Sequence, residues 1–390
     1  MSLYVAKFGG SSVGNPTRIK LAASIIVKLI ESSRAKIVVV TSAMQGVTNY
    51  LIDLARAVHD STDHREYDAI ISSGEQVAAG LLAAGLCSAG LPARSLNCWQ
   101  APIHAAGNYS NASITSIDIS RIMETIEDGI IPVITGFQGL SENRDILTIG
   151  RGGSDATACA VAHAIKADEC LIYTDVDGVY TADPRIVLDS KRLDEISYDE
   201  MLELAYCGAK VLQPRAVLIA KRCNVKIRVL SSFTDSGGTV VTDGKKDTTT
   251  ICIPNESYVS GIAHNTNLAK LIIAEDDENY PKLLEKLGQI DLFSMNDGTV
   301  SFLFQKSSLN EIKHSLANSM KFQIITDIGL VTIVGSGFKA DQSILVAVLE
   351  VANNRQIPIK QISVTENTIS VIVSLHQVEE LVNALHERVL

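Results

Sequence analysis

Short β-rich runs alternate with helical patterns over residues 1–240, and this alternation constrains the fold more than any other feature. Strands are expected at Leu3–Phe8 and at residues 36–42, 131–135, 170–174 and 226–230. Between the first two strands, Asn15 can cap a helix and Pro16 suits its first turn. Apolar residues then recur on one face at helical spacing: Ile19, Ala22, Ala23, Ile26 and Ile30. The alternation predicts an α/β fold with a mostly parallel sheet covered by helices on both faces.

A second region follows a composition change at residues 231–250, where glycine, serine, threonine and charge dominate. We therefore expect a first domain at 1–245. Beyond it, a shift of 69 residues places 290–304 on 359–373 without a gap, for example Ser294 on Ser363, and the register continues into a helix with Leu309 on Val378. This internal repeat predicts two strand–helix–strand–strand–helix units, small α+β domains at 255–322 and 323–390.

Bulk composition excludes several classes of protein. The net charge of −10 includes no block of like charges, which argues against nucleic acid or a membrane surface as partner. No apolar stretch approaches the ~20 residues that span a bilayer, and the N-terminus lacks a signal-peptide pattern. The seven cysteines form no C-x-x-C pair, so free thiols in a reducing, cytoplasmic location are expected instead of disulfides or a zinc ribbon.

Three glycine- or aspartate-rich loops follow predicted strands and carry the chemistry. In the first, Lys7 precedes Gly9 and Gly10, which let backbone amides approach phosphate oxygens. A P-loop is excluded, because Asn15 and Pro16 stand where that motif needs lysine and serine or threonine. A tight turn with a surface lysine is the alternative interpretation of this motif alone.

The second loop, Gly150 to Asp155, opens a helix expected over residues 156–167 that is apolar nearly all round. Free amides and the dipole at such a helix start form an anion site, and Arg151 adds a guanidinium suited to carboxylate or phosphate. The alternative is that Ser154 or Asp155 only caps the helix.

The third loop, 174–185, starts with an Asp-x-Asp pattern, but Val179 and Tyr180 do not fit a calcium loop. Ligands bind at such loops in open α/β sheets, although a solvated acidic loop is also possible. Weaker signals are Thr48, Glu75 and Lys210. The Gly-x-Gly-x-x-Ala pattern at 335–340 lacks the acidic residue and the chain length of a dinucleotide fold. No zinc-protease or hydrolase motif is present.

Four segments in order resemble the aspartokinases of the amino-acid kinase family: VAKFGGSSV at 5–13, TIGRGGSDATA at 148–158, TDVDGVYTADPR at 174–185 and GAKVLQPRAV at 208–217. The repeat after 250 is similar to that family's paired ACT domains. The resemblance covers essentially the whole chain. It implies an amino-acid kinase-like α/β domain followed by two ferredoxin-like ACT repeats, and transfer of the ATP γ-phosphoryl group to the side-chain carboxylate of L-aspartate. The product, 4-phospho-L-aspartate, leads towards lysine, threonine and methionine.

The resemblance also implies a role for each matching residue. The catalytic positions are Lys7 and Asp155. The substrate positions are Thr48, Glu75, Arg151 and Ser154. The nucleotide positions are Lys7, Gly9, Gly10, Thr174, Asp175, Tyr180, Arg185 and Lys210.

The chemistry of the reaction suits these residue types. An aspartate side chain is already ionised at pH 7, so no general base is needed. Positioning and charge stabilisation remain, from Lys7, Lys210, loop amides and a Mg²⁺ ion bound with the nucleotide. Asp155 would hold a lysine or metal-associated water, Glu75 would bind the substrate ammonium, and Arg151 a carboxylate.

Regulation by an amino acid, lysine or threonine, is a further implication of the resemblance. The expected effector positions are Ser336, Gly337, Phe338, Thr365 and Glu366. The first repeat departs from the family, because its segment 274–281 is acidic and lacks glycine, so we expect that repeat to serve a homodimer interface instead. Two alternatives remain: another amino-acid kinase, acting on glutamate, acetylglutamate, carbamate or UMP, or a catalytically silent amino-acid sensor, against which intact Lys7, Asp155 and Lys210 argue.

Overall fold

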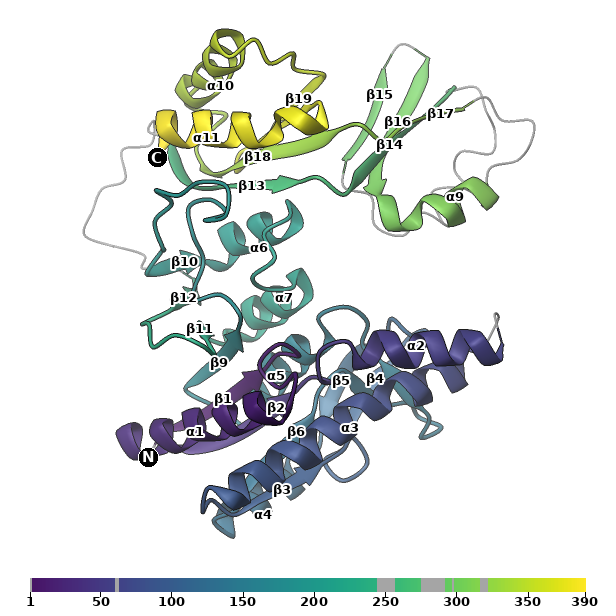
Figure 1. Ribbon diagram of the computed structural model, residues 1–390, viewed down its shortest axis with the longest axis vertical. Helices are drawn as coiled ribbons and strands as arrows, with labels where there is room; N and C mark the ends of the chain where they lie inside the picture. Colours follow the sequence, from purple (N-terminus) through teal and green to yellow (C-terminus); the bar gives the residue numbers. More distant parts are fainter. Residues whose placement is uncertain (1, 60–62, 244–256, 275–291, 297, 316–321) are drawn as a thin grey trace. The chain divides into compact units, whose positions relative to one another are not determined.

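The computed structural model describes residues 2–59, 63–243, 257–274, 292–296, 298–315 and 322–390 (Figure 1). The chain divides into two compact units. The first comprises Met1–Val179, Arg192–Leu202 and Lys210–Lys246, and the second comprises Tyr180–Lys191, Glu203–Ala209 and Asp247–Leu390.

The first unit is built on an eight-stranded sheet. Its strands lie in the order β10 (Glu195–Ser197), β12 (Thr239–Thr242), β11 (Ile227–Ser231), β9 (Glu169–Thr174), β1 (Leu3–Phe8), β2 (Lys36–Thr41), β6 (Ile131–Thr135) and β3 (Ala93–Leu96). All neighbouring pairs are parallel except β11 with β12. The five strands expected from the sequence are all present, and the predicted mostly parallel α/β fold is confirmed.

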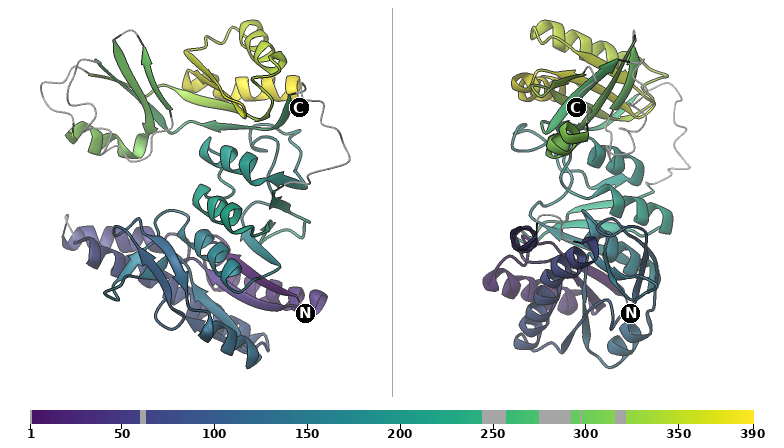
Figure 2. Two further views of the ribbon diagram at one scale, coloured as in Figure 1. Left: turned by 180° about the vertical axis from the view of Figure 1, so that it is seen from behind. Right: turned by 90° about the vertical axis from the view of Figure 1, so that its right-hand side faces the viewer.

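Helices cover both faces of this sheet (Figures 1 and 2). Helices α1 (Pro16–Ser33) and α3 (His64–Ser88) pack on one face, and α5 (Gly153–Ala164) with α7 (Pro214–Cys223) on the other. The Asn15 side chain caps α1 by accepting a hydrogen bond from the Arg18 amide at 3.0 Å, as predicted. The remaining helices of this unit are α2 (Val47–Val58), α4 (Ser120–Glu127) and the beginning of α6 (Tyr198–Tyr206).

The alternation of side chains along β1 decides which of them reach the site. Ala6 and Phe8 join the core beneath α1 and α3, where the Phe8 ring stacks on Tyr173 with centroids 4.8 Å apart. Lys7 lies between them in sequence, so it points to the opposite face, which α5 covers. A buried strand therefore delivers one lysine to the start of α5.

A smaller four-stranded sheet stands beside the large one. Its order is β5 (Ser113–Ile117), β4 (Ile103–Ala106), β7 (Gln138–Leu140) and β8 (Ile146–Thr148). Strand β8 leads into the glycine-rich loop that opens α5. The small sheet thus fixes one end of that loop.

Helix α3 corrects one expectation. With 25 residues it is long and apolar enough to pass the length and composition test for a membrane span, although no such stretch was expected from the sequence. Half of its apolar window is buried, and Ala79, Leu82 and Leu86 belong to the core of the first unit. Its apolar character is therefore explained by packing against the sheet.

The second unit holds two four-stranded antiparallel sheets. One has the order β13 (Tyr258–Asn265), β18 (Gly329–Ser336), β20 (Thr368–Val373) and β19 (Gln361–Val364). The other has the order β15 (Leu292–Asn296), β16 (Thr299–Gln305), β14 (Leu268–Ala274) and β17 (Phe322–Ile325). The described part of this unit includes the helices α9 (Leu309–Ser315), α10 (Ser343–Asn354) and α11 (Val378–Val389), with short 3₁₀ turns η1 (Lys306–Ser308) and η2 (Leu375–Gln377).

The internal repeat is confirmed in the register predicted from the sequence. A shift of 69 residues carries the first residues of β16, η1 and α9 onto those of β20, η2 and α11. Ser294 faces Ser301 across the strands of the first copy, as Ser363 faces Ser370 in the second. The second copy has the order strand–helix–strand–strand–helix. In the first copy, the first of the two expected helices lies outside the described residues, and so does most of the acidic segment 274–281.

Two strands pair with strands of the other copy of the repeat. Strand β13 precedes the first copy's other strands, yet it pairs with β18 of the second copy. Conversely, β17 pairs with β14 of the first copy. The second unit also includes the segment 180–191, whose Ala182 and Val187 are buried in the same core as α11. Thr181 secures this segment: its carbonyl accepts from the Ile262 amide at 2.7 Å, and its hydroxyl lies 2.9 Å from His386 Nε2.

Candidate active site

The site begins where β1 ends against the first turn of α5. Lys7 Nζ lies 2.5 Å from Asp155 Oδ1, and the two side chains are only 9% and 11% exposed. A buried ion pair of this kind holds both groups in one geometry, because separating them would leave an unpaired charge away from water. Asp155 therefore keeps the Lys7 ammonium at the carboxyl end of the central strand.

The glycine turn after β1 lies close to the loop that follows β2. The Gly10 carbonyl accepts a hydrogen bond from the Gln45 amide at 3.1 Å, and a Cβ atom on Gly10 would lie 3.0 Å from the Ala43 carbonyl oxygen. Any larger residue at position 10 would push the two loops apart. The glycine thus allows the backbone to line the cavity directly.

The loop before α5 has the backbone form that its glycines permit. Gly150 and Gly152 have φ values of 78° and 73°, in the left-handed region that residues with side chains disfavour. A Cβ atom on Gly152 would lie 2.3 Å from the Cβ of Gln213, so no side chain fits there. Ser154 and Asp155 stand in the first turn of α5 and are buried. The free amides and positive dipole end of α5 make this turn suitable for an anion.

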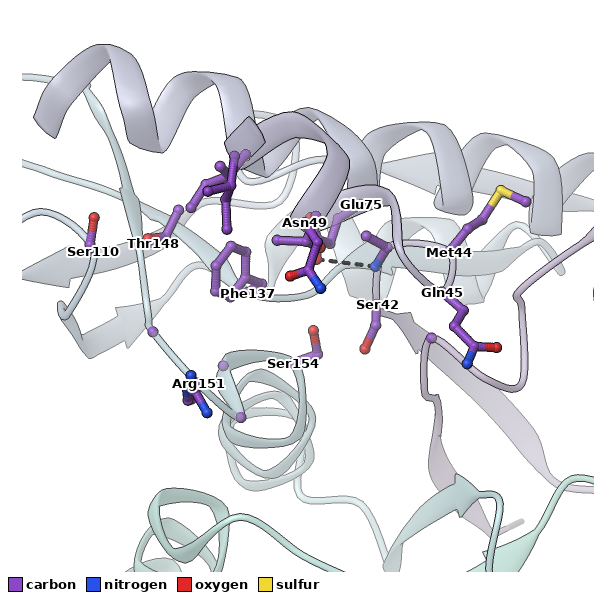
Figure 3. A pocket seen from close by; sticks show the side chains of 18 of the residues that line it. Ser42, Met44, Gln45, Asn49, Glu75, Ser110, Phe137, Thr148, Arg151 and Ser154 are labelled. Atoms are coloured by element: carbon purple, nitrogen blue, oxygen red, sulfur yellow. Dashed lines mark hydrogen bonds between the residues drawn. The ribbon is translucent and has the colours of Figure 1, made fainter. Parts of the chain in front are cut away.

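One cavity of about 820 Å³ joins these elements (Figure 3). It brings together seven of the residues singled out from the sequence: Lys7, Gly10, Thr48, Glu75, Arg151, Ser154 and Asp155. Figure 3 shows Ser154 and Arg151 on the side formed by the start of α5, and Glu75 on the opposite side. The cavity is therefore lined by cationic groups and by the carboxylates of Glu75 and Asp155, as a site for a zwitterion and a phosphate would be.

Glu75 is the most unusual carboxyl group in the cavity. One oxygen accepts from the Ala43 amide at 3.1 Å (dashed in Figure 3), while the other is buried without a hydrogen-bond partner in the described part of the chain. Burial raises the pKa of Glu75 to about 7, and the Ala43 hydrogen bond opposes part of that rise. An unpaired buried carboxylate oxygen facing a cavity is a natural partner for a ligand cation.

The other positions expected to bind nucleotide do not line this cavity. Thr174 is the last residue of β9 and Asp175 follows it, and the Thr174 hydroxyl donates to Asp175 at 3.1 Å. Lys210 is an exposed residue of the first unit before α7. Tyr180 and Arg185 belong to the second unit, and the Arg185 side chain is paired with Asp183. Gly9 adjoins the cavity through Gly10, and its amide donates to the Tyr173 carbonyl.

Sequence reasoning missed several residues of the cavity. Ser42 follows β2, the neighbour of β1 in the sheet, and Phe137 comes after β6, the next strand beyond β2. The ends of adjacent parallel strands meet at one edge, so their positions could have revealed these two residues. The other missed lining residues include Asn49, Arg56, Tyr67, Ser110, Thr148 and Gln213. Asn49, Arg56 and Tyr67 lie on helices, and Thr148 ends β8. Ser110 and Gln213 lie in loops, and no local pattern predicts that these segments meet.

The described residues contain no cluster of three or more histidine, cysteine or acidic side chains able to hold an ion. Asp155, the acidic group nearest the predicted phosphate position, is already paired with Lys7.

A parallel-sheet fold with a lysine, glycine loops and a helix start around one anion site defines a phosphotransferase. The chain belongs to the amino acid kinase family, whose sequence profile matches residues 2–231, and an ACT domain profile matches residues 323–387.

Relatives that align over nearly the whole chain are aspartate kinases. The chain is 39% identical to an aspartate kinase of Stutzerimonas stutzeri over 404 aligned residues, covering 99% of this chain and 97% of the relative. It is 37% identical to an aspartokinase of Mycolicibacterium smegmatis, covering 99% and 96%. Among solved structures, aspartokinase III of E. coli in complex with aspartate and ADP has a TM-score of 0.81 at 22% identity, with 99% of both chains covered. That likeness supports the fold.

Proposed function

We propose that this chain is an aspartate kinase that transfers the γ-phosphoryl group of ATP to the side-chain carboxylate of L-aspartate. The family and the full-length relatives support the activity. The observation that carries the substrate assignment is the cavity itself, where the unpaired oxygen of Glu75 faces a wall containing Arg151 and Ser154. An amino acid with a second carboxylate has charges that match this arrangement.

The acceptor would bind by its charged groups. Glu75 binds the α-ammonium, which supplies the missing partner of its buried oxygen, and Arg151 binds a carboxylate. Thr48 and Ser154 complete the contacts with neutral hydroxyl groups. Because the acceptor carboxylate is ionised at neutral pH, it attacks without a general base, and the site has only to hold it in line.

The phosphoryl group would pass next to the Lys7–Asp155 pair. As charge shifts on the transferring group, the Lys7 ammonium, the Gly10 amide and the amides at the start of α5 stabilise it. Asp155 holds Lys7 in place and takes no proton from the acceptor. Both charges are placed before the reaction starts, so little reorganisation is needed.

The nucleotide would be bound by residues after β9 and before α7. Thr174, Asp175 and Lys210, with Tyr180 and Arg185, are proposed on their match to the family's motifs. Mg²⁺ would reach the site with the phosphates and neutralise part of their charge.

A hydroxylamine-trapping assay tests the function directly. Acyl phosphate formed from ATP and Mg²⁺ is measured with L-aspartate, L-glutamate and N-acetylglutamate, and UMP phosphorylation is followed separately. We expect product with aspartate and at most a trace with the others. Product with another acceptor in preference to aspartate would assign the chain to a different amino acid kinase, and no product at all would favour the silent sensor.

Regulation by an amino acid is proposed for the second copy of the repeat. The loop after β18 lies against the turn before β20, since Gly335 and Phe338 donate to the carbonyls of Asn367 and Glu366. Ser336 and Glu366 are exposed, whereas the Phe338 side chain is buried in the core, so an effector would contact the loop backbone and its exposed neighbours. Lysine or threonine is the proposed effector. It would act on a homodimer formed through the repeats, and the proposed location of the protein is the cytoplasm.

A further inference from the structure

Phe137 has a backbone conformation that its residue type disfavours. Its φ is 69°, in the left-handed region where a bulky side chain is rarely found. Other residues with side chains adopt this conformation close behind the ends of helices, where it is common: Arg34, Lys166, Asn224 and Gln356. Phe137 lies instead between the strands β6 and β7, and it lines the cavity (Figure 3). A strained residue at such a place persists only where its surroundings hold it.

Two hydrogen bonds fix the backbone of Phe137. Its carbonyl accepts from the Ile149 amide at 2.8 Å. Its amide donates to the hydroxyl oxygen of Thr157 at 3.2 Å, and this hydroxyl donates its own proton to the Gly153 carbonyl at 2.8 Å. Thr157 is fully buried on α5. One buried hydroxyl therefore joins the strained backbone of Phe137 to the first turn of α5.

Phe137 and the residue before it pack closely on that first turn. A Cβ atom on Gly153 would lie 2.9 Å from the ring atom Cδ2 of Phe137 and 3.2 Å from its Cα, so the ring rests directly on the helix backbone. A Cβ atom on Gly136 would lie 2.7 Å from both Cβ and Oγ of Ser154. The turn formed by Gly136 and Phe137 is thus fitted against the residue of α5 that is proposed to contact the phosphoryl acceptor.

A change of φ at Phe137 would disturb both of these contacts. Relaxation to a negative φ turns the side chain about the backbone, which takes the ring away from Gly153 and shifts Gly136 against Ser154. Phe137, Ser154 and Glu75 line the same cavity, so its acceptor side would lose its shape. The proposed nucleotide residues after β9 follow a different strand. The disturbance should therefore affect aspartate more than ATP.

We infer that Thr157 is a positioning residue for the acceptor: its hydroxyl holds Phe137 in the left-handed conformation and so keeps the cavity wall fitted around Ser154. This inference rests on the proposed function, in which Ser154 and Glu75 bind the acceptor. Thr157 is not among the residues that line the cavity. It acts through the backbone of Phe137 and touches no substrate.

The test compares two substitutions of Thr157. Thr157→Val keeps the shape of the side chain and removes the hydroxyl, whereas Thr157→Ser keeps the hydroxyl and removes the methyl group. We expect KM for aspartate to rise about 10-fold in Thr157→Val and to stay within about twofold in Thr157→Ser, with KM for ATP within about twofold in both. Equal rises in the two KM values of Thr157→Val, or an equal rise in KM for aspartate in Thr157→Ser, would overturn the inference.

The matched control is Thr125→Val on α4. Thr125 is also fully buried, and its hydroxyl donates to the Arg121 carbonyl at 2.7 Å, four residues earlier, as Thr157 donates to Gly153. The control should lower Tm and leave both KM values unchanged. A matching rise in KM for aspartate would show that the loss of any buried helix hydroxyl is enough, against the inference. If Thr157→Val folds poorly, Thr157→Ala is compared with Thr157→Ser, because these two differ only in the hydroxyl.

A double-mutant cycle with Phe137→Gly tests the route of the effect. Glycine adopts a left-handed φ without strain, so it needs no hydroxyl to hold it. Thr157→Val should then change KM for aspartate by less than about twofold when it is added to Phe137→Gly. The full 10-fold effect in the Phe137→Gly background would mean that Thr157 does not act through Phe137.

Two measurements separate this inference from the proposed function. Phe137→Gly should have a Tm at or above that of Phe137→Ala, because only alanine is strained at this φ, and this comparison needs no activity. A clearly higher Tm for Phe137→Ala would remove the strain on which the inference depends. The wild-type assay with the acceptor panel is run first, so that a failure of the proposed function is seen before any variant is interpreted, and the same cycle applies to whichever acceptor is found.

Discussion

Lys7 Nζ lies 2.5 Å from Asp155 Oδ1, although 148 residues (155 minus 7) separate the two positions in the chain. The pair joins the carboxyl end of a central strand to the first turn of a buried helix. It holds a positive charge at the edge of the sheet where the phosphoryl group is proposed to move. The first prediction concerns that charge.

Replacing Lys7 with alanine should lower kcat by about 10²–10³, comparable to the loss of one oxyanion donor, with a smaller change in KM. The physical reason is that the ammonium is proposed to stabilise the transition state more than bound substrate. Steady-state kinetics with aspartate and ATP measure the effect, and Lys20→Ala on the exposed face of α1 is the control. A Lys7→Ala enzyme that kept a third of the wild-type kcat would contradict the assignment.

Substrate binding gives the second prediction. Glu75→Gln and Arg151→Ala should each weaken the binding of aspartate by roughly 2–5 kcal/mol, because each leaves a charge of the bound substrate unpaired. The exposed position of Arg151 places its effect at the lower end of that range. Titration calorimetry with aspartate, and separately with ATP, distinguishes the sites. Equal loss of ATP affinity in Arg151→Ala would place that residue at the phosphates.

The third prediction is a pH dependence that follows from Glu75. Burial raises its pKa from 4.5 to about 7 in the folded protein, so between these values the folded state binds a proton that the unfolded state has lost. The contribution of Glu75 to the free energy of unfolding therefore falls as pH rises through this window and is constant above it. Chemical denaturation of wild type and Glu75→Gln across pH 5–8 should show this difference in slope.

The same pKa affects catalysis in the opposite direction. The protonated carboxyl cannot pair with the substrate ammonium, so kcat/KM for aspartate should fall as pH drops below about 7. The Glu75→Gln enzyme should have a flatter profile in this range, at a lower level. An identical acidic limb in both enzymes would assign the titration to another group.

Regulation gives the fourth prediction. Lysine or threonine at millimolar concentration should change the apparent affinity for substrate by roughly 5–150-fold, and the protein should sediment as a dimer or larger. Glu366→Ala should weaken the response without changing uninhibited activity, while Glu380→Ala, on exposed surface of α11, should not. A monomer that responds to no amino acid would leave the repeat with a structural role only.

Local patterns in the sequence predicted a large part of this protein. Period-two and helical spacing located the strands from Leu3–Phe8 onward and the helix that Asn15 caps, because these patterns depend on neighbours a few residues apart. The offset of 69 residues predicted the register of the repeat, since each copy has to bury the same faces. The glycine loops after predicted strands drew attention to Lys7 and Asp155, which stand beside them. Such loops can be recognised in the sequence because their backbone needs residues without side chains.

Only the tertiary structure decided which distant segments meet. Strand β13 pairs with the second copy of the repeat, and the segment with Ala182 and Val187 joins its core, because strand pairing and core packing are settled by long-range contacts that no local period encodes. Ser42, Phe137, Ser110 and Thr148 enter the cavity for the same reason. No local pattern shows that Thr157 holds Phe137. That contact follows from the packing of the turn after β6 on the first turn of α5, between residues that lie 20 positions apart in the chain.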